Sequence, residues 1–276
     1  MPIDEQQADS LASRILAAAG TVSSIPPVTA GMPDFALRDA YRVAARIVER
    51  RMARGERPVG WKIGFTNRTI WDEYGVHAPI WGPMYDSTVQ AVDPAEGPMP
   101  CLLGPLVEPR IEPEIVLRIA ATPRPDMDER ALLSCFDAVG HGVEIVQSVF
   151  PGWKFQAPDT VAAFALHGCY RHGPLVAVSP AERQDWLARL SDFEMVLFRD
   201  GQEVDRGRAA NVLGGPLSAL RHFVRGLSEH PLPIGLRPGH LVTTGTVTRA
   251  FPVHAGERWS TEIIGLPLPG INLLFT

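Results

Sequence analysis

The spacing of apolar and polar residues divides the chain into a helical beginning and a strand-rich remainder. Residues 10–19, SLASRILAAA, are rich in alanine with helical periodicity, and the glycine that follows is a natural stop. After a linker, apolar residues recur at a spacing of about 3.6 as far as residue 54, which predicts a second helix. We therefore predict a helical segment over residues 1–56 and a strand-rich domain over residues 57–276.

Beyond residue 56, short β-like runs alternate with glycine and proline turns. These runs are PVGWKIG, EPEIVLRIA, GVEIVQSV, FEMVLFRDG, HLVTTGTV, WSTEIIG and NLLFT. An Asp-Gly pair between two strand-like runs predicts a hairpin over residues 193–208. One helix is predicted among the strands, over residues 216–227. Because strands and helices do not alternate, the pattern predicts an α+β fold and not a doubly wound parallel sheet.

Composition and charge narrow the class of protein. The chain has 276 residues, of which 45% are hydrophobic and 21% are charged, and these values exclude a disordered chain or a coiled coil. Its formal net charge of −5 gives no general attraction to a phosphate backbone, so we expect no nucleic-acid partner. No apolar run approaches the roughly 20 residues of a membrane helix, so we expect no membrane partner.

The beginning of the sequence and its cysteines indicate a cytoplasmic protein. The opening stretch, MPIDEQQADS, is polar and acid-rich, unlike a signal or transit peptide. Three cysteines are an odd number and have no CxxC spacing, which is typical of reduced thiols and not of a disulfide framework. We therefore expect a cytoplasmic location.

The segment RIEPEIVLRI, residues 110–119, has the most informative pattern for chemistry. As a strand it places Glu112 and Glu114 on one face, about 7 Å apart, and apolar residues on the other. Neighbouring carboxylates repel unless a cation lies between them, and their oxygens are natural ligands of Mg²⁺ or Mn²⁺. The alternative is an edge strand with a solvated acidic face, or with an arginine partner such as Arg110.

A third acid, Glu144, lies in another apolar run. Its neighbours in GVEIV are valine and isoleucine, and a glutamate in such surroundings is almost never buried without a partner. Three acids in two apolar strands therefore favour an oxygen-ligand metal site, in which water or substrate completes the coordination.

The run PVGWKIG places a lysine on a face that is otherwise bare of side chains. Strand alternation puts Lys62 between Gly60 and Gly64, with larger apolar residues on the opposite face. The glycines allow a ligand to approach the backbone closely, and the lysine supplies a positive charge or moves a proton. A surface lysine on an edge strand is the alternative.

Seven short motifs then occur in an order that resembles one known family. They are GWKIG followed by Thr66, RIEPEI, VEIV, DTVA, GGPL, TTGT and HAGE. From about Pro58 to the end, the chain resembles the 2-keto-4-pentenoate hydratase family of the fumarylacetoacetate-hydrolase-fold superfamily, which is related to 2-oxo-acid decarboxylases. The resemblance implies a mixed β-roll or sandwich like the superfamily's C-terminal domain, preceded by a helical segment.

The resemblance also implies roles for individual residues. Glu112, Glu114 and Glu144 match the ligands of Mg²⁺ or Mn²⁺, and Lys62 matches the active-site lysine. Asp159 is a candidate catalytic residue, with a helix cap as the alternative. The candidate substrate contacts are Gly64, Phe65, Phe164, Leu166 and Thr244.

One stretch departs from the family pattern. Hydratases of this family typically read DTVADNAS, whereas this chain reads DTVAAFAL, with Ala163, Phe164 and Leu166 in place of polar residues. An apolar wall disfavours the orientation of water, and it favours a different substrate or a decarboxylase-like reaction. The same residues are also compatible with an ordinary apolar core.

The resemblance implies a lyase of aromatic catabolism that acts on a small 2-oxo acid. The leading hypothesis is a hydratase that adds water to a 2-hydroxy-2,4-dienoate to form a 4-hydroxy-2-oxo acid. The alternatives are a 4-oxalocrotonate-type decarboxylase and a catalytically silent partner subunit. An acylpyruvate-type hydrolase ranks third, because GFTNRTIWDEYG lacks the early histidine of such hydrolases and the next one is His77. We expect a homo-oligomer, with association with a related lyase subunit as a further prediction.

Overall fold

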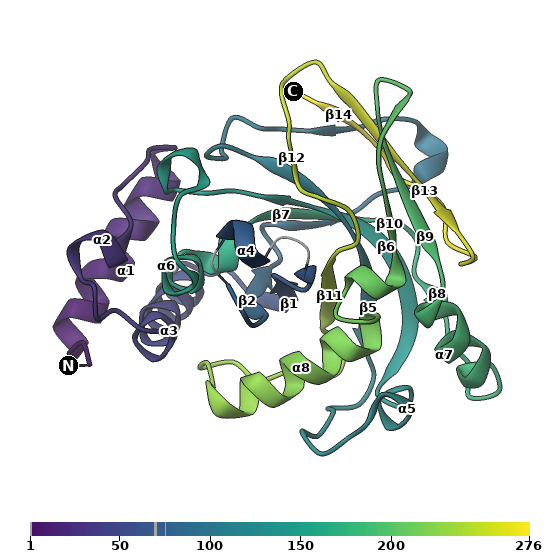
Figure 1. The fold of residues 1–276 in the computed structure, drawn as a ribbon, viewed down its shortest axis with the longest axis horizontal. Coiled ribbons are helices and arrows are strands. Elements are labelled where there is room, and N and C mark those ends of the chain that lie inside the picture. Colours follow the sequence, from purple (N-terminus) through teal and green to yellow (C-terminus); the bar gives the residue numbers. More distant parts are fainter. Residues whose placement is uncertain (1, 69–70, 75) are drawn as a thin grey trace.

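A strongly curled mixed sheet forms the centre of the computed structural model, which describes residues 2–68, 71–74 and 76–276 (Figure 1). Its strands are β1 (Pro58–Gly64), β2 (Ile80–Tyr85), β3 (Val89–Ala91), β5 (Arg110–Ile119), β6 (Phe136–Val146), β7 (His167–His172), β8 (Val176–Ala177), β11 (Leu241–Thr246) and β12 (Phe251–Pro252). The order along the sheet is β2-β1-β11-β5-β6-β7-β3, with β12 beside β5 and β8 beside β6. Most neighbours are antiparallel, whereas β1 with β11 and β3 with β7 are parallel.

A second sheet packs against one end of the first. Its strands are β4 (Met99–Cys101), β9 (Glu194–Arg199), β10 (Gln202–Arg208), β13 (Arg258–Ile264) and β14 (Asn272–Phe275), in the order β10-β9-β13-β14-β4. Between the sheets, Ile111 and Ile145 of the first contact the cluster around Trp259 of the second. The predicted hairpin is confirmed, and its turn places Asp200 and Gly201 at φ of 50° and 80°, as a tight two-residue turn requires.

Most helices gather on two sides of the curled sheet (Figure 1). The α-helices are α1 (Glu5–Gly20), α2 (Val28–Gly31), α3 (Leu37–Ala53), α4 (Trp71–Tyr74), α5 (Glu129–Leu132), α6 (Ala157–Ala162), α7 (Arg183–Ser191) and α8 (Pro216–Glu229). Short 3₁₀ turns are η2 (Pro94–Glu96), η3 (Pro151–Trp153), η4 (Phe164–Leu166) and η5 (Ala209–Asn211). Helices α1, α2, α3 and α6 lie together on one side, and α8 crosses below β1 and β11. Within the part of the chain described, no helix is both long and apolar enough to cross a membrane.

The predicted α+β class is confirmed, and the helices share a core with the sheet. Ile15 and Ile47 of the N-terminal helices belong to the same buried cluster as Trp61 of β1 and Phe223 of α8. The division at residue 56 stays a prediction. Helix α7 was not predicted, because it buries little besides Trp186 and Leu190 and so carries a weak apolar stripe.

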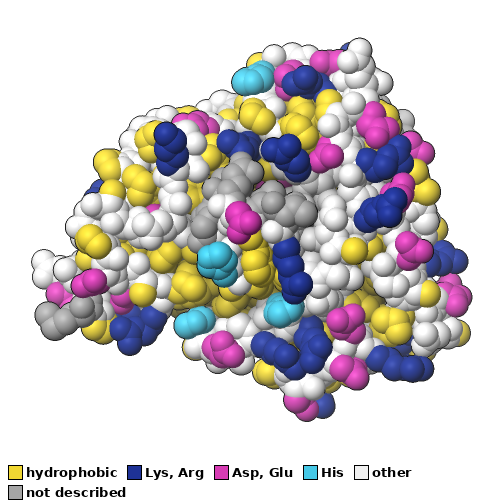
Figure 2. Space-filling view, in the orientation of Figure 1, with side chains coloured by type: hydrophobic (Ala, Val, Ile, Leu, Met, Phe, Trp, Pro, Cys, Tyr) yellow, Lys and Arg dark blue, Asp and Glu magenta, His cyan; other side chains and the backbone are white. Residues whose placement is uncertain are grey.

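A groove opens between α3, α8 and β2. Tyr41 of α3 stacks on Trp81 of β2 at 4.9 Å between ring centroids, and on His230 at 5.0 Å. Figure 2 shows hydrophobic side chains gathered in this hollow, with histidines at its margin. The aromatic stack therefore attaches the N-terminal helices to the sheet.

Gly226 of α8 provides a test of this packing. A Cβ at this position would lie 2.2 Å from the Trp81 ring, so the usual helical advantage of alanine is outweighed by overlap. We expect Gly226→Ala to lower the free energy of unfolding by about 1–3 kcal/mol in urea denaturation. The control Ser228→Ala, at an exposed position of the same helix, should change it by less than about 0.5 kcal/mol. Equal values for the two variants would contradict the packing argument.

Candidate active site

The pairing of β5 with β6 brings the three predicted acids together. Glu112 lies directly opposite Glu144, and Glu114 lies two residues further along β5 on the same face. Each offers one carboxylate oxygen, and these oxygens all lie within 4.8 Å of one another. Glu114 and Glu144 are fully buried, whereas Glu112 keeps some exposure. The alternative of a solvated acidic face is therefore excluded for Glu114 and Glu144.

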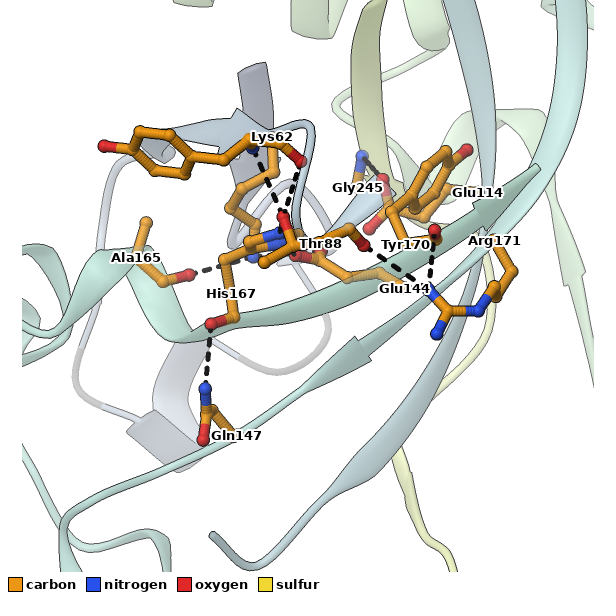
Figure 3. A network of polar contacts seen from close by, with 11 residues as sticks. Lys62, Thr88, Glu114, Glu144, Gln147, Ala165, His167, Tyr170, Arg171 and Gly245 are labelled. Carbon is orange, nitrogen blue, oxygen red and sulfur yellow. Dashed lines mark hydrogen bonds and ion pairs between the residues drawn. The ribbon is translucent and has the colours of Figure 1, made fainter. Parts of the chain in front are cut away.

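In both buried carboxylates, one oxygen is held by a hydrogen bond from the protein and the other is not. Glu114 Oε2 accepts a hydrogen bond of 2.9 Å from the backbone N–H of Gly245, and Glu144 Oε1 accepts one of 2.7 Å from His167 Nδ1 (Figure 3). Among the described residues, Glu114 Oε1 has no hydrogen-bond partner, and Glu144 Oε2 has none besides its ion pair with Lys62. A buried carboxylate oxygen without a partner is costly, and a hard divalent cation relieves that cost. The three glutamates therefore fit a metal ligand set.

Gly245 makes the close contact with Glu114 feasible. Its φ is +90°, and a Cβ there would lie 1.8 Å from Thr66 Oγ1. Only glycine leaves room for this approach. The buried Thr66 hydroxyl, which has no hydrogen-bond partner in the described residues, lines the cavity beside this point.

Lys62 of β1 lies against the carboxylates and is 2% exposed. Its Nζ donates a hydrogen bond of 2.9 Å to the Ala165 carbonyl, and it lies 3.1 Å from Glu144 Oε2. The carbonyl belongs to the η4 turn, Phe164–Leu166, whose three residues have φ of 60°, 51° and 63°. This left-handed conformation costs free energy in L-residues, and such strain concentrates at functional sites.

The charges in this cluster shift one another's pKa values. Burial raises the pKa of Glu112 to about 7, against the opposing effect of Lys62. Burial, and then repulsion by Glu144 and Glu112, raises the pKa of Glu114 well above its ordinary value. Burial also opposes ionisation of Glu144, but Lys62 and His167 together hold its pKa below the ordinary value. The pKa of Lys62 is raised because the glutamates outweigh its burial. Glu144 and Lys62 therefore form the ionised pair, whereas without a cation Glu114 favours its protonated form and Glu112 is only partly ionised at neutral pH.

His167 is a member of this cluster that the sequence did not reveal. It begins β7, is buried, and meets Glu144 across 23 residues of sequence through the pairing of β6 with β7. No local motif marks it. Burial lowers its pKa despite the neighbouring Glu144 carboxylate, so the imidazole is neutral at neutral pH.

A cavity beside the cluster has a polar part and an apolar part. The polar part comprises Lys62, Thr66, Asn67, Glu112 and Thr246. The apolar part comprises Phe65, Ile80, Val146, Trp153 and Leu166. A small molecule with one charged end and one apolar end matches this division.

The predicted substrate contacts divide into two groups. Gly64, Phe65 and Leu166 line the cavity. Phe164 instead lines a separate hollow against α3 and β2, because the η4 turn directs it away. The Thr244 hydroxyl is buried and donates to the Ile115 carbonyl at 3.2 Å, and the cavity is lined by Thr246, two residues further on. Phe164 and Thr244 are therefore not among the residues that line the cavity, and their contact with substrate stays a prediction.

Asp159 lies apart from the cavity. One of its oxygens accepts from the Thr29 backbone N–H at 3.0 Å, and the other accepts from the Thr29 hydroxyl at 2.7 Å and the Gln156 N–H at 2.9 Å. These contacts anchor the first turn of α6 to α2. The structure thus favours the alternative of a helix cap over a catalytic role for Asp159.

Comparisons with known proteins agree with this geometry. The 2-keto-4-pentenoate hydratase of Paraburkholderia xenovorans is 32% identical over 261 residues, covering 95% of this chain and 93% of that protein. A 4-oxalocrotonate decarboxylase of Pseudomonas is 29% identical over 93% of this chain and 94% of that protein. No family model matches the sequence.

Solved structures give the same result for the fold. The 4-oxalocrotonate decarboxylase from Pseudomonas putida G7, complexed with magnesium and adipate, superposes with a TM-score of 0.89 at 27% identity, covering 99% of both chains. The fumarylpyruvate hydrolase from Pseudomonas aeruginosa, in complex with Mn²⁺ and pyruvate, has a TM-score of 0.55 at 17% identity over 78% of this chain and 88% of that one, a likeness of fold alone.

The curled sheet and its buried carboxylates define a protein of the fumarylacetoacetate hydrolase fold. Within that fold, the chain belongs to the 2-keto-4-pentenoate hydratase family. The resemblance found in the sequence is thereby confirmed.

The raised pKa values predict how stability depends on pH. A carboxyl whose pKa is higher in the folded state contributes stability below its unfolded pKa of about 4.5, and this stability is lost as the pH rises through the folded pKa, about 7 for Glu112. Buried His141 and His167, whose pKa values are lowered, contribute the opposite slope below about pH 6.5, so the carboxyl effect is isolated by comparison with the double variant Glu112→Gln/Glu114→Gln. In metal-free protein in chelator, we expect the wild type to lose free energy of unfolding relative to this variant from about pH 5 to about pH 8 in urea denaturation. Equal slopes would refute the assignment.

Proposed function

We propose that this protein is a divalent-metal-dependent lyase that adds water to a 2-hydroxy-2,4-dienoate to form a 4-hydroxy-2-oxo acid. The observation that carries the proposal is the state of two buried carboxylate oxygens: among the described residues, Glu114 Oε1 has no hydrogen-bond partner and Glu144 Oε2 has only the Lys62 ammonium, 3.1 Å away. Relatives of this chain in the same family are named as hydratases, which supports this reaction. Glu112, Glu114 and Glu144 would hold Mg²⁺ or Mn²⁺.

The substrate's atoms define what the residues must do. In a 2-hydroxy-2,4-dienoate, the 2-hydroxyl loses a proton and C5 gains one, and water then adds a hydroxyl at C4 and a hydrogen at C3. When bound, the cation supplies Lewis-acid polarisation of the substrate's carboxylate and 2-oxo oxygens. Lys62 holds the substrate's negative charge or moves the proton, and its two fixed contacts keep Nζ in place for that role. Thr66, whose hydroxyl has no hydrogen-bond partner among the described residues, lines the polar part of the cavity.

A 4-oxalocrotonate-type decarboxylase is the second candidate. Val146, Trp153 and Leu166 form a buried apolar cluster at the cavity, and loss of CO₂ needs no oriented water. The similarity to the magnesium-complexed decarboxylase supports the same alternative. Incubation with 2-hydroxypentadienoate and with 4-oxalocrotonate, followed by product analysis, separates the two: a 4-hydroxy-2-oxo acid supports hydration, and CO₂ supports decarboxylation.

The hydrolase has no support here, because His77 lines the groove beside Trp81 and is not among the residues of the cavity. Turnover without added subunits would exclude the catalytically silent partner. The homo-oligomer, the association with a related lyase subunit and the cytoplasmic location stay predictions.

Removal of one carboxylate tests the metal site. Glu114→Gln keeps the shape of the side chain but removes its negative charge, so Mn²⁺ affinity should weaken by more than the 10–100-fold typical of lost outer-sphere contacts, and turnover should be abolished. Titration calorimetry with Mn²⁺ and steady-state kinetics measure both quantities. The control Glu262→Gln, at an exposed strand position, should behave as wild type. Unchanged turnover in Glu114→Gln would remove Glu114 from the site.

Removal of the ammonium separates chemistry from metal binding. Lys62→Met should lower kcat by roughly 100-fold or more, the usual size of a proton-transfer contribution, while Mn²⁺ affinity is retained because a repelling positive charge is removed. The chain's other lysine, Lys154, is exposed, and Lys154→Met is the matched control. Equal losses of kcat and Mn²⁺ affinity in Lys62→Met would make the role of Lys62 structural.

A further inference from the structure

His167 lies outside the cavity and yet contacts the carboxylate cluster. Its Nδ1 is 2.7 Å from Glu144 Oε1, and its Nε2 is 2.9 Å from the Thr88 hydroxyl (Figure 3). The ring is 2% exposed, and it does not line the cavity that holds Lys62. Both ring nitrogens are therefore used inside the protein, one of them on a candidate metal ligand.

The chemistry of the partners determines how the protons are arranged. An ionised Glu144 can only accept, so Nδ1 carries the ring proton and donates it to Oε1. Nε2 is then an acceptor 2.9 Å from the Thr88 hydroxyl, whose one proton is shared between Nε2 and the Tyr85 carbonyl, 3.1 Å from the same oxygen. The backbone N–H of Tyr85 donates to the same hydroxyl at 3.2 Å, which keeps Thr88 in place.

The backbone of His167 is fixed as well. Gln147 Nε2 donates to the His167 carbonyl at 3.2 Å, and its Oε1 accepts from the Val107 N–H at the same distance. Both the ring and the backbone of His167 therefore have few alternative positions. A rigid donor can determine the orientation of the carboxylate that it contacts.

Glu144 needs such a donor because Lys62 competes for its free oxygen. Lys62 Nζ is 3.1 Å from Glu144 Oε2, and Glu144 offers a carboxylate oxygen within 4.8 Å of one oxygen of each of the other two glutamates. If Oε1 were also free, the carboxylate could rotate and place both oxygens around the ammonium. The hydrogen bond from His167 opposes this rotation because it holds Oε1 at 2.7 Å from Nδ1.

We propose that His167 is a positioning residue, which holds Glu144 so that Oε2 stays directed into the carboxylate cluster and available to a divalent cation. This inference rests on the proposed metal-dependent function. His141 provides the contrast: it is also a buried histidine with two contacts, but it contacts the Glu114 backbone carbonyl and the Thr261 hydroxyl, and no carboxylate.

Two substitutions of similar polarity separate the contacts of His167. Asparagine places its amide nitrogen near the position of Nδ1, so His167→Asn keeps a donor for Glu144. Glutamine reaches the position of Nε2 and not that of Nδ1, so His167→Gln keeps the contact with Thr88 only. We expect His167→Gln to weaken Mn²⁺ binding by about 10–100-fold and His167→Asn to retain most of the affinity.

The Mn²⁺ dissociation constant is measured by titration of the metal-free protein, with free Mn²⁺ followed by electron paramagnetic resonance. The same variants are assayed at saturating Mn²⁺, where kcat of His167→Gln should recover toward wild type. The control His254→Gln, at an exposed position outside the site, should leave Mn²⁺ affinity unchanged. Equal Mn²⁺ affinity in His167→Gln and His167→Asn, whether retained or lost, would overturn the proposal.

Thr88→Val keeps the proposal testable if His167→Gln does not fold. Thr88 is partly exposed, and valine matches its shape without the hydroxyl that orients the imidazole. We expect a smaller loss of Mn²⁺ affinity in the same direction, and unchanged affinity would contradict the role of His167. Wild-type protein that binds no Mn²⁺ would instead overturn the proposed function itself, so the two failures are distinguishable.

Discussion

The burial of like charges in one cluster is the constraint on which the rest of this structure depends. Two carboxylates without any exposure lie beside a third and beside a buried ammonium. Lys62 offsets one negative charge, and Glu144 is the carboxyl that it keeps ionised. The remaining charge is balanced by protons on Glu112 and Glu114 or by a divalent cation. Binding of a metal and release of protons are therefore coupled at this site, as they are wherever protonated ligands must ionise to bind.

The scaffold holds each member of the cluster by a different contact. Strand pairing places Glu112 opposite Glu144, and a glycine amide fixes Glu114. The strained η4 turn offers a carbonyl to Lys62, and Gly82 of β2 leaves room for that turn, since a Cβ there would lie 3.0 Å from the Phe164 carbonyl oxygen. Because these contacts involve mainly backbone atoms, the charged groups are preorganised and little rearrangement is needed at the moment of reaction.

The choice between hydration and decarboxylation depends on the other half of the cavity. Leu166 stands where family hydratases typically carry a polar residue, and with Val146 and Trp153 it forms an apolar wall. Water that adds to a substrate there must be oriented by the polar part of the cavity, where the Thr66 hydroxyl has no partner among the described residues. The apolar wall suits the uncharged distal end of a 2-hydroxy-2,4-dienoate, whereas the second carboxylate of 4-oxalocrotonate would lose hydration there, although its loss as CO₂ needs no oriented water. The two lyase reactions thus share the carboxylate cluster, and they differ in the part of the substrate that contacts the apolar wall.

The sequence alone determined the strand content, the shared face of Glu112 and Glu114, the hairpin and the family, because alternation and motif order are local properties of the chain. Tertiary structure determined which residues are in contact. It places His167 against the carboxylate cluster and Thr246 in the lining of the cavity, and it leaves Phe164 and Thr244 outside that lining. It also places the Asp159 carboxylate in hydrogen bonds at the first turn of α6. Those outcomes follow from strand register, from the left-handed turn and from side-chain contacts between residues far apart in the chain, and none of these is encoded in local spacing.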